Sequence, residues 1–114
     1  MQLSSADALH HTVEGAPTLT NARKARGLFD PVFAQLGSQA VGDKPVDERQ
    51  TLEVSLGGVT DGNSVLVSLM LVWLRRARGA GLGMHYLDIP PLVMNLIEFT
   101  GLDEVLPIAP GKST

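Results

Sequence analysis

The feature of the sequence that most constrains the fold is a strand-like segment followed by a turn and a strongly apolar helix. Residues 51–56 alternate between polar and apolar, which is the pattern of a β-strand with one buried face. After an Asp-Gly turn come Asn63 and Ser64, residue types that cap helices, and residues 65–74 are apolar except for Ser68. This order predicts that Ser64 lies at the amino end of a helix. Unpaired N–H groups and the helix dipole favour an anion there, either a bound phosphate or a phosphate added to Ser64.

Short strands and helices alternate along the rest of the chain, which predicts a single α/β domain over residues 1–114 with its core at about 9–106. The one-sided alternation of residues 51–56 favours a mixed sheet of about four or five strands with helices mainly on one face. We expect a flexible N-terminal segment, a surface loop at 37–50 and a disordered tail at 108–114. The patterns predict strands at 10–14 and 82–87 and helices at 21–36, 64–78 and 91–100, with Pro31 kinking or restarting the first helix.

The composition argues against several functions. The 114 residues carry a formal net charge of −3, which argues against nucleic acid or an anionic membrane surface as a partner. The chain has no cysteine, so disulfides and thiolate chemistry are excluded. We see no secretory signal, and the longest apolar run, residues 65–74, is too short to span a membrane. We therefore expect a cytoplasmic protein without a membrane span.

Motifs for catalysis or ligand binding are weak. Ser64, His85 and Asp88 can be written as a triad, but no Gly-X-Ser-X-Gly elbow surrounds the serine. The adjacent His10 and His11 would face opposite sides of a strand and make a poor chelating pair. We expect no catalytic residue, no metal and no cofactor, so that a small esterase or nucleotide-handling enzyme is a minor alternative and a purely structural scaffold another.

Several segments together resemble a STAS domain, the fold of anti-sigma factor antagonists and of transporter regulators. They are Leu56-Gly57-Gly58-Val59-Thr60, Asn63-Ser64, the apolar helix closed by Leu74-Arg75-Arg76-Ala77-Arg78, and Thr100-Gly101-Leu102-Asp103-Glu104-Val105-Leu106. Within that family, the chain is most similar to the small STAS subunit of Mla-type phospholipid ABC transporters. At the strand-to-helix turn, Asn63 stands where the family usually has Asp, Ser64 keeps the hydroxyl, and Val65 replaces a small residue.

The resemblance implies a non-catalytic regulatory subunit that binds the ATPase subunit of an Mla-type transporter, which maintains outer-membrane phospholipid asymmetry. Such a subunit would lie peripheral to the inner membrane through its partner. The implied contact residues are Ser64, Asn63, Ser68, Leu71 and Arg75. The alternative within the fold is an anti-sigma factor antagonist, a partner-switching regulator phosphorylated on Ser64 by an anti-sigma factor kinase.

The apolar helix itself has two interpretations. It is either a deeply buried central helix or one that exposes a docking strip, made of Ser68, Leu71, Val72 and Arg75, to another protein. Both can hold on different faces of the helix. An exposed strip would also encourage the isolated domain to form a homodimer.

Overall fold

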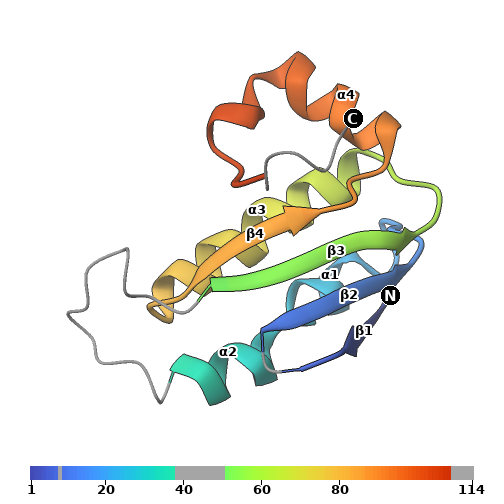
Figure 1. Ribbon diagram of the computed structural model, residues 1–114. Coiled ribbons are helices and arrows are strands. Elements are labelled where there is room, and N and C mark those ends of the chain that lie inside the picture. Colours follow the sequence, from blue (N-terminus) through green and yellow to red (C-terminus); the bar gives the residue numbers. More distant parts are fainter. Residues whose placement is uncertain (8, 38–50, 109–114) are drawn as a thin grey trace.

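A computed structural model describes residues 1–7, 9–37 and 51–108. At its centre is a four-stranded sheet in the order β1-β2-β3-β4 (Figure 1). β1 pairs antiparallel with β2, whereas β2, β3 and β4 run parallel. The strands are β1 (Gln2–Ser5), β2 (His10–Gly15), β3 (Thr51–Val59) and β4 (Gly83–Leu87). The prediction of a mixed sheet in an α/β fold is confirmed.

Helices make the connections between the parallel strands, as parallel pairing requires. α1 and α2 lie between β2 and β3, α3 lies between β3 and β4, and α4 follows β4 and packs against α3. The helices are α1 (Ala22–Arg26), α2 (Asp30–Gly37), α3 (Ser64–Gly79) and α4 (Pro91–Thr100), followed by the short 3₁₀ helix η2 (Leu102–Glu104). No helix within the described residues is long and apolar enough to cross a membrane.

The two faces of the sheet have different environments. On β3, Leu52, Val54 and Leu56 are fully buried, while the polar residues between them are only partly buried. On β4, Met84 and Tyr86 are buried and His85 is exposed. Helices α1, α2 and α3 lie behind the sheet in Figure 1 and cover the buried face. Among the described residues, the side chains on the other face, which we call the open face, are exposed or partly buried. The alternation in the sequence therefore predicted the layering correctly.

Two buried polar side chains fix α3 in this layer. Trp73 is fully buried, and its Nε1 donates a hydrogen bond to the carbonyl oxygen of Ala25 in α1 at 2.7 Å. The hydroxyl of Tyr86 in β4 donates to the carbonyl oxygen of Met70 in α3 at 2.6 Å. Burial of this phenol raises its pKa well above the usual value. α3 is thus tied to a helix on one side and to the sheet beneath it, which holds its amino end in a defined place.

Two segments near the ends of the described residues pair with strands of the sheet. The N-terminal segment, expected to be flexible, contains β1, and its largely exposed side chains gave the sequence no strand pattern. The tail, expected to be disordered from residue 108, begins with a residue in the sheet, because Ile108 forms a β-bridge with Tyr86. Residues 109–114 of the tail and 38–50 of the predicted loop lie outside the described residues.

The helix predicted over residues 21–36 is two helices. α1 ends at Arg26, where the N–H of Gly27 donates to the carbonyl oxygen of Lys24 and the N–H of Leu28 donates to that of Ala25. α2 begins at Asp30, and Pro31 occupies its first turn, where its missing N–H costs nothing. Of the two effects expected from Pro31, a kink or a restart of the helix, the structure shows the restart.

Candidate functional site

Asn63 caps α3. Its backbone is extended, with φ −153° and ψ −171°, and its side-chain oxygen accepts a hydrogen bond from the N–H of Val65 at 2.9 Å. Ser64 is the first residue of the helix, and its side chain is exposed. Within the described residues, the Ser64 hydroxyl has no hydrogen-bond partner. The capping role expected for this pair is therefore carried by Asn63, which leaves the hydroxyl of Ser64 available to another molecule.

The amide nitrogen of Asn63 joins the helix start to a neighbouring loop. It donates to the carbonyl oxygen of Pro17, between β2 and α1, at 3.0 Å, and to that of Asp61 at 3.1 Å. Asp61 has a left-handed backbone, with φ 52°. Gly62 packs so closely on α4 that a Cβ atom added there would lie 2.5 Å from a methyl group of Val93. The turn before Ser64 is therefore fixed by the hydrogen bond to Pro17 on one side and by packing against α4 on the other.

The residues predicted to form a contact site share one face of α3. Ser64, Ser68 and Arg75 are exposed and Leu71 is half-buried, whereas Asn63 is half-buried at the cap. Their spacing of three and four residues places them in a row along the helix. The opposite side is core and contains Leu66, Leu69, Met70, Trp73 and Ala77. One face of the apolar helix is therefore buried in the core and the other is at least partly exposed, while the use of the exposed face for docking stays a prediction.

A groove runs between this face of α3 and α1. Its volume is about 240 Å³, and we call it the α1–α3 groove. The lining residues are Leu19, Ala22, Arg23, Arg26, Val65, Ser68, Leu69 and Val72. Its α3 wall includes Val65 and Val72, both half-buried, and its α1 wall carries two exposed arginines. Leu19 is 86% exposed. The α1 side of this groove was missed in the sequence, although the basic run Arg23-Lys24-Ala25-Arg26 was a signal for it.

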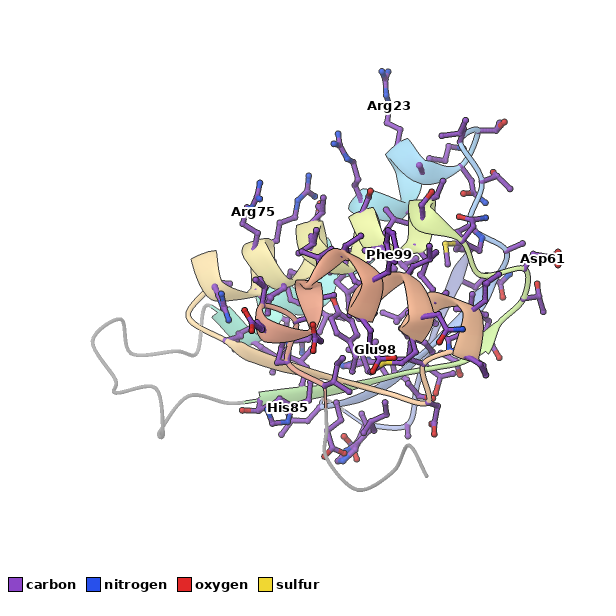
Figure 2. The ribbon with its side chains drawn as sticks, turned by 90° about the horizontal axis from the view of Figure 1, so that it is seen from above. Arg23, Asp61, Arg75, His85, Glu98 and Phe99 are labelled. Atoms are coloured by element: carbon purple, nitrogen blue, oxygen red, sulfur yellow. The ribbon has the colours of Figure 1, made fainter. Side chains whose placement is uncertain are left out.

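Positive charge is concentrated around the groove. All lysine and arginine residues within the described ranges lie on α1 or α3, and neither helix contains an acidic residue: the cations are Arg23, Lys24, Arg26, Arg75, Arg76 and Arg78. Arg76 is paired with Asp30 of α2 at 3.0 Å. Figure 2 shows Arg23 and Arg75 pointing away from the sheet on the same side of the molecule, with His85 on the opposite side. The surface formed by α1 and α3 is basic although the chain as a whole is acidic.

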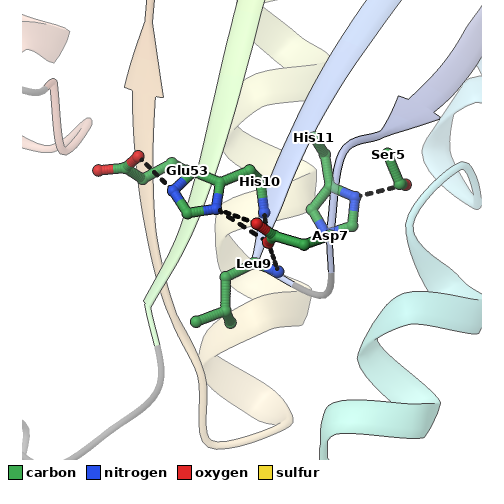
Figure 3. A network of polar contacts seen from close by, with 6 residues as sticks. All are labelled: Ser5, Asp7, Leu9, His10, His11 and Glu53. Carbon is green, nitrogen blue, oxygen red and sulfur yellow. Dashed lines mark hydrogen bonds and ion pairs between the residues drawn. The ribbon is translucent and has the colours of Figure 1, made fainter.

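The open face of the sheet carries a polar cluster instead (Figure 3). Nδ1 of His10 lies 2.9 Å from Asp7, and its Nε2 lies 3.0 Å from Glu53 of β3. The hydrogen bond and charge of Asp7 raise the pKa of His10, and the same hydrogen bond lowers the pKa of Asp7. His11 faces the other way, is 4% exposed, and shares a hydrogen bond of 2.7 Å with the hydroxyl of Ser5. The opposite orientation predicted for the two histidines is confirmed.

Catalytic and metal-binding arrangements are not formed by the residues considered for them. Ser64 is on the helical side of the sheet, while His85 is on the open face. Asp88 accepts a hydrogen bond from Ser55 at 2.7 Å, not from a histidine. Within the described residues, no group of three histidine, aspartate or glutamate side chains is placed to hold a metal ion. The exposed face of α3 and the adjoining groove remain as the candidate functional surface.

Solved structures with the same fold include a subunit of an MlaFEDB complex and anti-sigma factor antagonists. The chain matches the MlaB subunit of the Acinetobacter MlaFEDB complex, in an ATP-bound conformation, with a TM-score of 0.69 and 19% identity over 96% of this chain and 100% of that one. It matches the unphosphorylated anti-sigma factor antagonist SpoIIAA with a TM-score of 0.62 and 18% identity, over 95% of this chain and 86% of that one. An anti-sigma factor antagonist from Mycobacterium paratuberculosis matches with a TM-score of 0.61 and 20% identity, over 96% of this chain and 83% of that one.

At the level of sequence, no protein-family model and no curated protein matches the chain. Identities below a quarter establish the shared fold. The mixed four-stranded sheet, the helices on one face and these three structural matches agree with the resemblance found in the sequence. The chain is a domain with the STAS fold.

Proposed function

We propose that this chain is a non-catalytic regulatory subunit that binds the ATPase subunit of an Mla-type phospholipid ABC transporter. The observation that carries the proposal is the exposed row of Ser64, Ser68 and Arg75 along α3. The row begins at the helix amino end with the Ser64 hydroxyl, which has no hydrogen-bond partner among the residues that the structure describes. The structural match to a subunit of the MlaFEDB complex supports it. In this role the chain works on the cytoplasmic side of the inner membrane and is held there by its partner.

The mechanism is a population shift. A subunit that binds only the assembly-competent conformation of an ATPase increases the population of that conformation by its differential binding free energy. α3 is suited to this because its position is fixed by Trp73 and Tyr86, so that little ordering is needed when the partner binds. No residue of the chain takes part in the hydrolysis of ATP in this mechanism.

A charge introduced at Ser64 tests the contact. Ser64→Asp places a carboxylate at the helix amino end, where the dipole favours it, so the variant is expected to fold. In a partner interface the same charge is desolvated, and we expect binding to the purified ATPase subunit to weaken by about tenfold or more. Ser64→Ala is the matched control, because it removes the hydroxyl without adding charge. Ser64→Asp binding as tightly as the wild type would rule out a contact at Ser64.

The second candidate is an anti-sigma factor antagonist that is switched by phosphorylation of Ser64. The exposure of the hydroxyl and the matches to two antagonists support it. Val65 counts against it, because this larger side chain is half-buried beside Ser64 and reduces access for a kinase. Incubation with a cognate anti-sigma factor kinase and ATP separates the two functions. Phosphate on the Ser64 peptide, located by mass spectrometry, supports the antagonist, whereas stimulation of the transporter ATPase supports the regulatory subunit.

A further inference from the structure

We propose that the α1–α3 groove binds an acidic segment of the ATPase subunit, which inserts one large apolar side chain between the two helices. Carboxylates of that segment pair with Arg23 and Arg26 on the α1 wall. The inference rests on the proposed function for the identity of the partner. It adds a second contact region, on α1, to the row of residues along α3.

The size of the groove sets the size of its occupant. Pockets that enclose cofactors and drug-sized ligands have volumes of about 300 to 1,000 Å³. The α1–α3 groove has about 240 Å³ and apolar residues on both walls, Ala22 on one and Val65 and Val72 on the other. These dimensions suit one inserted aliphatic or aromatic side chain. Exposed Leu19 extends the apolar surface at the groove and offers further contact area to the same segment.

The arginines set the charge of the occupant. Within the described residues, neither Arg23 nor Arg26 has an ion-pair partner, whereas Arg76 on the adjacent helix is already paired with Asp30. A guanidinium group presents donors in a planar fork that matches a carboxylate, and arginine is common among the residues that dominate interface energies. Unpaired arginines beside an apolar groove are therefore complementary to a segment that alternates acidic and large apolar residues.

The shape of the surface favours a protein over a membrane. Peripheral membrane binding depends on apolar side chains that protrude into the lipid, as on the apolar face of an amphipathic helix. Apart from Leu19, the apolar residues here are recessed between the helices, and Leu69 is buried. A recess of this kind receives a side chain that protrudes from another protein.

Charge reversal on α1 tests the inference. The double variant Arg23→Glu/Arg26→Glu is compared with Lys24→Glu, which changes an exposed residue of the same helix that does not line the groove. Affinity for the purified ATPase subunit is measured by titration calorimetry. We expect the double variant to weaken binding by about tenfold or more, and Lys24→Glu to change it by less than about threefold. Leu19→Ser, which removes exposed apolar surface only, is expected to weaken binding by about threefold to tenfold.

The outcomes separate this inference from the proposed function. If the wild-type chain does not bind the ATPase subunit, both are wrong. If it binds and the folded double variant binds equally well, the groove is not the contact and only the inference is overturned. Co-sedimentation with vesicles of phosphatidylglycerol and phosphatidylethanolamine covers the membrane alternative. Loss of vesicle binding in the double variant, with ATPase binding unchanged, overturns the inference as well.

Discussion

Replacement of Asn63 by aspartate isolates the donor role of its side-chain amide, because the two residues have nearly the same shape. Aspartate keeps the oxygen that accepts the N–H of Val65 and caps α3. It loses both hydrogen bonds from the amide nitrogen, to the carbonyl oxygens of Pro17 and Asp61. The variant therefore tests whether this residue serves only as a helix cap or also ties the β2–α1 loop to the turn that presents Ser64.

The expected loss of stability in Asn63→Asp follows from the burial of the two hydrogen bonds that are lost. The bond to Asp61 is exposed and contributes little, whereas the bond to Pro17 is partly buried, so its loss costs about 0.5–1.5 kcal/mol. The substitution also places a second acceptor near the Pro17 carbonyl oxygen, which adds repulsion. A carboxylate at the helix amino end recovers about 0.3–1 kcal/mol. Because the repulsion and this gain oppose each other, we take them to offset, and we expect Asn63→Asp to lower the free energy of unfolding by about 1 kcal/mol, the cost of the lost bond to Pro17.

Urea unfolding followed by the fluorescence of Trp73, the single tryptophan and a fully buried one, measures this change. With a slope of about 2 kcal/mol per molar urea, the midpoint should fall by about 0.5 M. Asn63→Ala also loses the cap, which costs a further amount of about 1 kcal/mol, so the expected order of stability is wild type, Asn63→Asp, Asn63→Ala. An aspartate variant at least as stable as the wild type at pH 7 would refute the donor role.

Two further perturbations address the open face of the sheet and the turn. The stability that the His10–Asp7 pair contributes should be greatest between about pH 4 and pH 6.5. The pKa of His10 is raised by folding, so the contribution of His10 is complete below about pH 6.5 and is lost as the pH rises through the pKa of the folded state. The pKa of Asp7 is lowered by folding, so the contribution of Asp7 is complete above about pH 3.8 and is lost on acidification. The difference in unfolding free energy between wild type and His10→Gln, measured at pH 5 and pH 8.5, should shrink at the higher pH, and an equal difference at both would contradict the pairing shown in Figure 3. Gly62→Ala should destabilise the domain by about 1–3 kcal/mol, because the new Cβ atom overlaps Val93. Gly79→Ala has open space around the new Cβ atom, so its effect on stability should be neutral or favourable by up to about 1 kcal/mol. Thermal unfolding of the two glycine variants compares them directly, and equal effects would show that the turn before α3 can move away from α4.

Most of the fold could be predicted because its signals are local. The alternation in β3 and the apolar run of α3 each record the burial of one face, and Pro and Gly residues mark the ends of helices. β1 could not be predicted in this way. It is an edge strand whose pairing with β2 depends on backbone hydrogen bonds, and its mostly exposed side chains carry no periodic pattern.

The candidate site was predictable only along α3. Helical spacing alone places Ser64, Ser68 and Arg75 on one face, and the structure leaves that face exposed. The α1–α3 groove required knowledge of which helix lies beside α3, and that is decided by a contact 48 residues apart in sequence, between Trp73 and Ala25. The sequence also could not show that Asn63 is the cap while the Ser64 hydroxyl stays free of partners among the described residues. The hydrogen bond that holds the Asn63 side chain goes to Pro17, which is 46 residues away in the chain.

The net charge illustrates how composition can mislead about partners. A formal charge of −3 argues against a basic surface only if charge is spread evenly, and here the cations of the described residues are confined to α1 and α3. Two carboxylates of the described residues, Asp7 and Glu53, lie beside His10 on the open face of the sheet, on the other side from Arg23 and Arg75. A partner that approaches the helical face therefore meets the guanidinium groups at shorter range than these carboxylates. The sign of the charge that it meets is set by the arginines in contact with it, and an acidic chain can select an acidic segment.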